Sequence, residues 1–156
     1  MKKTIAIIGA LDTKGLEFGF LKKEIEKRGC DTFVINVGVM GAPPFIPDVA
    51  AEEVALAGGS HLSELVKRAD RGEAMAAMTA GVAKVAVKYY EAGKFDGIIS
   101  MGGGGGTVMA TSAMRALPIG VPKLMVTTIA SGDTRQEYFW RSRLQIAFVS
   151  SGSSSP

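Results

Sequence analysis

Gly97-Ile98-Ile99-Ser100-Met101 runs directly into Gly102-Gly103-Gly104-Gly105-Gly106-Thr107. The first five residues form a short apolar run, which predicts a buried strand over 98–101, and the residues that follow the glycines predict a helix over 108–117. Glycines let the backbone approach a ligand closely, and the first turn of a helix offers unpaired N–H groups at its positive end. The stretch therefore predicts a cradle for an anion, most often a phosphate, because one or two glycines would suffice for a tight connection.

The rest of the chain supplies the other layers of an α/β fold. Apolar, β-branched runs alternate with stretches whose apolar residues recur every three or four positions. This order predicts a three-layer, Rossmann-like, mostly parallel doubly wound sheet in one domain. The further expected strands are 4–9, 31–39 and 123–129, and the further expected helices are 16–28, 48–57, 61–69 and 73–91. We expect the lobe to span 1–135 and residues 136–156 to form an atypical tail.

Three polar or glycine-rich turns follow expected strands, and in a parallel sheet such turns meet at the carboxyl edge where ligands bind. Asp12 and Thr13 are also typical helix caps, Lys14 could be a solvated cation, and the turn after the last strand could be an ordinary one. The predicted ligand-binding residues are Asp12, Thr13, Lys14, Gly102, Gly103, Gly104, Gly105, Gly106, Thr107, Thr127, Ser131 and Gly132.

Known glycine motifs fit this chain poorly. A Walker A loop needs Lys and then Ser or Thr after its last glycine, whereas Gly106 precedes Thr107 and Val108. A dinucleotide fingerprint would place its glycines after the first strand, which argues against a nicotinamide cofactor. The Gly-Gly-Asp-Gly-Thr loop of some small-molecule kinases would put its aspartate at Gly105. No catalytic residue can be assigned, and no metal cluster is apparent.

Three separated motifs, 9–15, 100–107 and 123–134, together resemble an uncharacterised ATP-binding family. That family includes the N-terminal inhibitory region of the tomato mosaic virus resistance protein. The resemblance covers about residues 2–135 and implies a Rossmann-like first lobe of a larger two-lobed protein. It also implies ATP as the ligand, with Mg²⁺ as an accompanying ion. The sequence after Arg135 departs from the family pattern.

The composition limits the partners and the cellular location that we expect for this protein. The chain of 156 residues has a formal net charge of +3 without a long basic run, so we expect no nucleic-acid partner. Nothing approaches the roughly 20 apolar residues of a membrane span, so we expect no membrane partner. Cys30 is the only cysteine, which excludes an internal disulfide and favours the cytoplasm.

The sequence predicts a domain that binds ATP or another small phosphate ligand, without an assignable reaction. One alternative is part of a phosphoryl- or sugar-phosphate-processing enzyme that a second lobe completes. Another is an interaction module that forms a homo-oligomer, a dimer, through the proline-rich loop 43–47 and the methionine-bearing helix 73–91.

Overall fold

The computed structural model describes residues 2–131 and 144–148. Its centre is a five-stranded sheet in which every neighbouring pair is parallel, with the strand order β2-β1-β3-β4-β5. The strands are β1 (Thr4–Gly9), β2 (Asp31–Asn36), β3 (Gly97–Gly102), β4 (Lys123–Thr127) and β5 (Leu144–Phe148). The expected parallel α/β sheet is confirmed.

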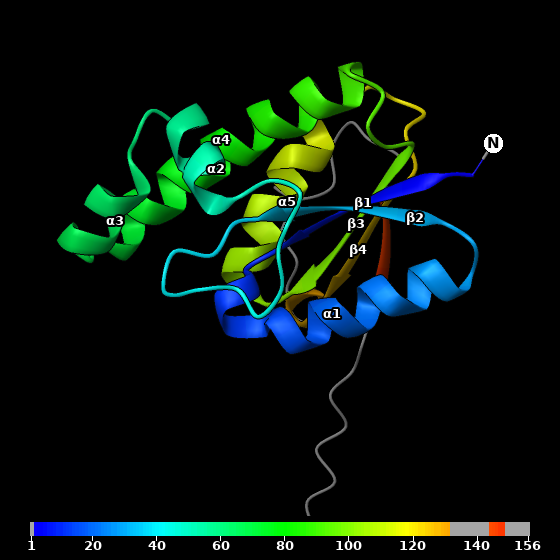
Figure 1. Ribbon diagram of the computed structural model, residues 1–156, viewed down its shortest axis with the longest axis horizontal. Helices are drawn as coiled ribbons and strands as arrows, with labels where there is room; N and C mark the ends of the chain where they lie inside the picture. The colour runs from blue at the N-terminus through cyan, green and yellow to red at the C-terminus, as the bar shows by residue number, and fades with distance from the viewer. Residues whose placement is uncertain (1, 132–143, 149–156) are drawn as a thin grey trace, which may run out of the picture.

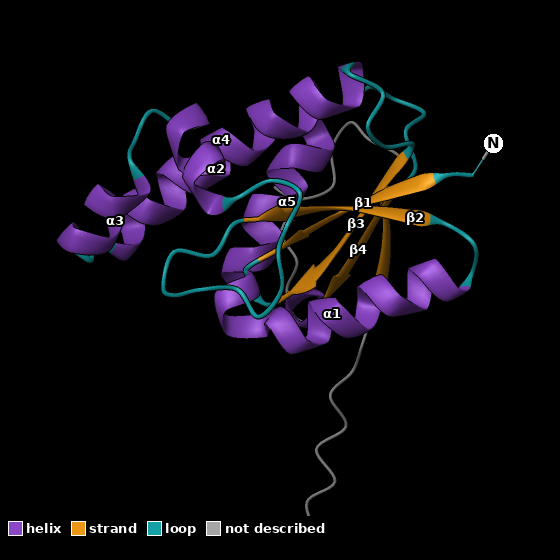
Figure 2. Cartoon of the chain, viewed as in Figure 1, coloured by secondary structure: helices purple, strands orange, loops and turns teal. Residues whose placement is uncertain are grey.

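Helices cover both faces of the sheet, which gives three layers (Figure 1). The helix α1 (Leu11–Lys27) lies on one face, and α5 (Gly104–Ala116) lies on the other with the longer α4 (Arg71–Glu91) packed over it (Figure 2). Two short helices, α2 (Ala51–Ala57) and α3 (Leu62–Arg68), extend this second layer. A 3₁₀ turn, η1 (Thr128–Ser131), follows β4.

The core divides accordingly into two parts. The larger part lies between the sheet and the α4–α5 layer and includes Ile8, Ile98 and Met125. The smaller part lies under α1, where Ile7 and Phe18 are almost completely buried. Alternate residues of one strand thus enter opposite cores, as expected for a strand covered on both faces.

Several predicted boundaries need correction. The segment 102–107 is not a loop, because β3 includes Gly102 and α5 already begins at Gly104. The strands predicted over 31–39 and 123–129 end at Asn36 and Thr127, and η1 takes the residues after Thr127. Most of the glycine run therefore belongs to the N-cap and first turn of α5.

Two further helix starts differ from the prediction. α1 begins at Leu11 rather than at residue 16, with a kink at Lys14, and at Gly15 the ring of Pro44 occupies the place that a Cβ would take. Asp48 does not cap α2. Its carboxylate instead accepts a hydrogen bond from the N–H of Val34 at 2.7 Å, and α2 begins at Ala51.

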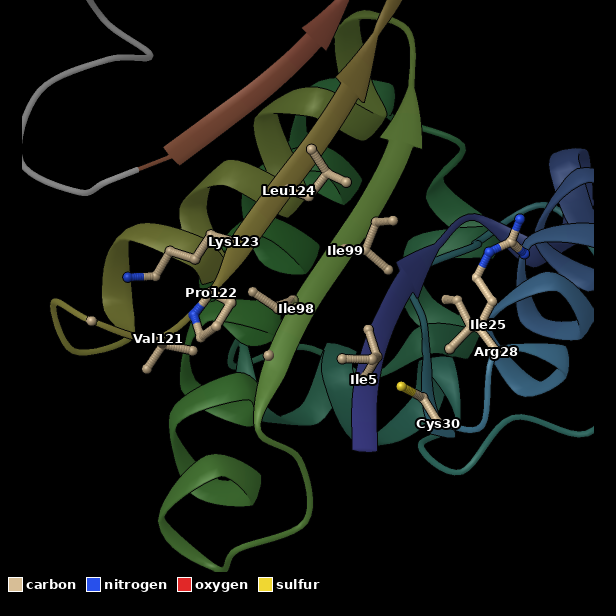
Figure 3. A pocket seen from close by; sticks show the side chains of 12 residues that line it. Ile5, Ile25, Arg28, Cys30, Ile98, Ile99, Val121, Pro122, Lys123 and Leu124 are labelled. Atoms are coloured by element: carbon tan, nitrogen blue, oxygen red, sulfur yellow. The ribbon is translucent and has the colours of Figure 1, made fainter. Parts of the chain in front are cut away.

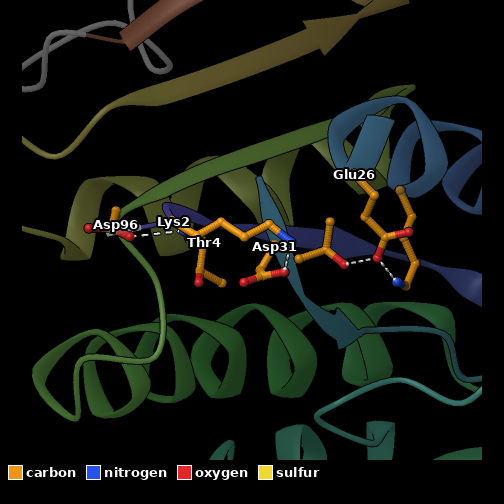
Figure 4. Close-up of polar contacts among 7 residues, drawn as sticks. Lys2, Thr4, Glu26, Asp31 and Asp96 are labelled. Carbon is orange, nitrogen blue, oxygen red and sulfur yellow. Dashed lines mark hydrogen bonds and ion pairs between the residues drawn. The ribbon is translucent and has the colours of Figure 1, made fainter. Parts of the chain in front are cut away.

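Ion pairs and backbone hydrogen bonds join the chain at the amino ends of the strands (Figure 4). Asp96 accepts a hydrogen bond from the N–H of Thr4 at 2.9 Å and pairs with Lys3, while Lys2 pairs with Asp31. These contacts lie at the edge opposite the glycine run. No helix in the described part of the chain has both the length and the apolar content needed to cross a membrane.

The expectation that residues 136–156 form an atypical tail stays a prediction. β5 pairs with β4 in parallel, Leu144 opposite Lys123, which places part of 136–156 in the sheet. Residues 136–143 and 149–156 lie outside the described residues.

Candidate functional site: a helix N-terminus at the switch point of the sheet

The strand order creates a defined crevice at the carboxyl edge. The chain proceeds from β1 to β2 in one direction and then from β3 to β4 in the other, so the connections α1 and α5 cover opposite faces. In open parallel sheets ligands bind where this direction reverses, here between β1 and β3. The two turns that leave these strands contain the first two groups of predicted site residues.

A cavity of about 730 Å³ lies at this point. It is lined by Asp12, Thr13 and Lys14 from the start of α1 and by all five glycines from Gly102 to Gly106. Its volume falls within the roughly 300–1,000 Å³ that is usual for small-molecule sites. Two of the three predicted loops therefore form one cavity.

The amides of the glycine run are unengaged. Within the described residues, the N–H groups of Gly104, Gly105 and Gly106 donate to no protein acceptor. The first amide of α5 that does so belongs to Thr107, which donates to the carbonyl of Gly103 at 2.9 Å. Three free donors at the positive end of a 13-residue helix thus line the cavity.

Packing does not explain these glycines. None of the five has a φ in the left-handed region, and a Cβ built on any of them would come no closer than 3.4 Å to a neighbouring segment. By contrast, a Cβ on Gly9 would lie 2.5 Å from the ring of Phe18, so the fold itself requires that glycine. Gly104, Gly105 and Gly106 lower the stability of the first turn of α5, by roughly 0.5–1 kcal/mol per residue against Ala, and no packing contact requires them.

Asp12 holds the loop that follows β2. One carboxylate oxygen accepts a hydrogen bond from the N–H of Met40 at 2.6 Å and the other from the N–H of Thr13 at 2.7 Å. The side chain also lies against Gly38, where a Cβ would come within 2.5 Å of it. Asp12 therefore joins the start of α1 to the loop after β2, and both segments line the cavity.

Asn36 performs the capping that the sequence suggested for Asp12. Its buried side-chain oxygen accepts hydrogen bonds from the N–H of Leu11 at 3.2 Å and from the N–H of Gly38 at 2.9 Å. The first of these amides belongs to the start of α1 and the second to the loop after β2. Sequence reasoning missed Asn36 because the contact joins residues 25 positions apart.

Thr107 and Thr127 lie behind the glycine run and not in the cavity wall. Both are buried, and their hydroxyl oxygens are 2.6 Å apart. Thr107 also donates to the carbonyl of Gly103 at 2.7 Å. Ser131 is the last residue of η1, and Gly132 lies outside the described residues. As far as the structure describes the third predicted loop, its residue Thr127 supports the glycine run from behind and does not line the cavity.

Arg71 is a cavity residue that sequence reasoning missed. It is the first residue of α4, exposed, and within the described residues it has no ion pair or side-chain hydrogen bond. Lys14 is likewise exposed and without such a partner there. The cavity therefore offers two uncommitted cations besides its free amides. Within that same part of the chain no three His, Cys, Asp or Glu side chains gather as a metal site would require.

The rest of the cavity wall is mainly apolar, apart from Asp70 and Ser100. Val39 and Met40 follow β2, Val66 belongs to α3, and Met75 and Met78 belong to α4. Met78 is buried and Met75 is half-buried, so both methionines line the cavity, and the oligomer face expected on this helix and on the loop 43–47 stays a prediction. The cavity thus combines free backbone amides and two cations with the carboxylates of Asp12 and Asp70 and a mainly apolar remainder.

Over residues 3–141 the chain matches the N-terminal domain of an uncharacterised protein family, UPF0261. The chain belongs to this family. A UPF0261 protein of Clostridium tetani is 51% identical over 135 residues, which are 86% of this chain and 33% of that protein. A UPF0261 protein of Rhizobium meliloti is 38% identical over 84% of this chain and 32% of its own length. The chain spans about a third of the length of these bacterial UPF0261 relatives.

A plant protein shares part of the same region. The ToMV susceptible protein tm-1(GCR26) of Solanum lycopersicum is 42% identical over 64 residues, which are 41% of this chain and 8% of that protein. The expected relationship to this family is therefore confirmed at the level of the UPF0261 N-terminal domain.

Proposed function

We propose that this UPF0261 domain binds a nucleotide or related phosphate ligand, with the phosphates at the N-terminus of α5. One observation carries the proposal. Neither packing nor backbone conformation requires glycine at the five positions from Gly102 to Gly106, and three amides at this helix start are free. Clearance for an oxyanion explains both features, since bulk at these positions would obstruct approach to the amides.

Charge and position support the same assignment. Lys14 and Arg71 provide positive charge from two other elements of the cavity, and neither forms an ion pair with a described side chain. The apolar remainder of the cavity suits the flat, weakly polar surface of a nucleobase. ATP is the ligand that the family resemblance implies, and Mg²⁺ would then be bound chiefly by the phosphates, as is usual for this ion.

Titration calorimetry with ATP and Mg²⁺, ADP, AMP and inorganic phosphate tests the proposal. The decisive variant is Gly104→Val, because Gly104 is exposed and nothing lies within 4 Å of a Cβ there. Gly41→Val is the matched control, since that site is equally open and does not line the cavity. We expect loss of binding by roughly tenfold or more in the first variant only. No binding of any phosphate compound, or equal binding by both variants, would contradict the proposal.

The length of the UPF0261 relatives favours a second candidate. Because this chain spans a third of them, the remainder could supply the acid and base of a phosphoryl- or sugar-phosphate-processing enzyme around the same anion site. A screen of phosphorylated metabolites against the full-length Clostridium tetani relative distinguishes turnover from simple binding.

A further inference from the structure

The sheet face that carries α1 has an apolar strip beyond that helix. The strip consists of Ile99 and Met101 on β3 and of Leu124 and Val126 on β4, four half-buried side chains. The register pairs Ile99 with Leu124 and Met101 with Val126, so all four lie on the same face. Ile99 and Met101 contact the core under α1, whereas Leu124 and Val126 belong to neither described core.

A shallow hollow extends the strip toward the amino ends of the strands (Figure 3). It has a volume of about 510 Å³ and is lined mainly by apolar side chains, among them Ile5, Ile25, Ile99 and Leu124. Ile25 belongs to α1, so the hollow joins the flank of that helix to the strip. The strip and the hollow form one continuous apolar surface, which we call the β3–β4 face.

The topology explains why no helix of the described residues covers this face. In the described part of the chain α1 is the one helix on this side, and it contacts the sheet over β1 and β2 (Figure 1). Right-handed crossovers that proceed from β3 toward β4 run over the opposite face, where α5 lies. The helices of the described residues therefore leave the β3–β4 face open to an element from elsewhere.

We propose that the β3–β4 face is the docking surface for an amphipathic helix from the segment that follows this domain in full-length UPF0261 proteins. The matched region is the N-terminal domain of its family, and the bacterial relatives are about three times as long as the part they share with this chain. A strand of six residues is about 20 Å long, which a helix of about 13 residues would span. Such a helix would lie beside α1 and complete the third layer.

Cysteine labelling tests this assignment. In a Cys30→Ser background, Leu124→Cys and Val126→Cys place a thiol on the face, and Met125→Cys is the matched control on the same strand, where the native side chain is fully buried in the opposite core. Maleimide labelling is followed by mass spectrometry in the present chain, and sedimentation gives its oligomeric state. The position that aligns with Leu124 is labelled in the same way in the full-length Clostridium tetani relative.

We expect Leu124→Cys and Val126→Cys to react at least tenfold faster than Met125→Cys in a monomeric present chain. We expect the aligned position in the full-length relative to be protected by a similar factor. Fast labelling in the full-length relative would overturn the proposal. Protection of these cysteines in the present chain that disappears on dilution would overturn the proposal and would indicate that a second copy of the chain covers the face. Protection in a monomer would also overturn it, because the face would then be covered within the chain itself.

Discussion

The hydroxyl oxygens of Thr107 and Thr127 lie 2.6 Å apart, in a buried contact between the first turn of α5 and the end of β4. Thr107 also bonds to the carbonyl of Gly103, the residue that precedes the helix. The glycine run contributes no side chains that could fix its own position. The contact between the two threonines therefore holds the free amides in place from behind.

Thr127→Val should destabilise the protein by about 1 kcal/mol, because it keeps the shape of the side chain and removes one buried hydroxyl. Thr127→Ser, which keeps the hydroxyl, should preserve the contact with Thr107. In a double-mutant cycle with Thr107→Val, urea unfolding should give a coupling energy of about 0.5–1.5 kcal/mol. Additive effects would show that the two hydroxyls do not act together.

Much of the site could be predicted because local sequence determines it. Apolar runs followed by glycines specify strand ends, and parallel strands bring those ends to one edge. The glycine run and Asp12-Thr13-Lys14 were therefore expected near each other, and they share the cavity. Predicting Gly102 to Thr107 as a loop failed because glycine is a poor helix former, whereas the neighbouring structure fixes the first turn.

Arg71 and Asn36 could not be predicted, for a different reason. Arg71 reaches the cavity only through the path of α2 and α3 between β2 and α4, a tertiary arrangement with no local signal. Asn36 caps α1 across 25 residues, so its partner is invisible in the sequence around it. Similarly, the need for glycine at position 15 comes from a distant segment, because the ring of Pro44 occupies the place that a Cβ would take.

Arg71→Ala should have two effects of opposite sign. A cation at the first position of α4 is unfavourable beside the positive end of the helix, so its removal should stabilise the unliganded protein by about 0.3–1 kcal/mol. Loss of a cation from the cavity should weaken binding of a phosphate ligand by roughly fivefold at low salt, and less at high salt.

Calorimetry at two salt concentrations and thermal unfolding measure these effects. Lys14→Ala should weaken binding similarly, and Lys23→Ala, an exposed lysine of α1 outside the cavity lining, is the control. Unchanged affinity in both cavity variants would show that neither Lys14 nor Arg71 contributes to binding of the phosphate ligand.

Asp12→Asn should loosen the loop after β2. The amide group can replace one carboxylate acceptor but not both, and hydrogen bonds to charged groups contribute about 1.5–3 kcal/mol. The N–H of Met40 should therefore lose protection against hydrogen exchange by roughly tenfold or more. Asp31→Asn, which alters only an exposed pair with Lys2, should leave that amide unchanged. Equal protection of Met40 in both variants would show that Asp12 does not hold the loop.

Lys123 should make stability depend on pH in the alkaline range. Its ammonium group is buried at the end of α5 and donates to the carbonyls of Leu117 at 3.2 Å and Pro118 at 2.8 Å, and burial lowers its pKa below the ordinary value of 10.5. Between the folded pKa and 10.5 the unfolded chain binds more protons at this site than the folded chain. Deprotonation therefore favours folding, and the contribution of Lys123 to stability should rise with pH through that window.

Lys123→Met removes the titrating group and keeps much of the side-chain volume. The difference in unfolding free energy between the native protein and this variant, measured by urea unfolding from neutral pH toward 10.5, should shift in favour of the native protein. Lys23→Met serves as the control for the loss of one lysine charge at an exposed position. A difference that stays constant or falls with pH would mean that the carbonyls at the end of α5 compensate the buried charge fully.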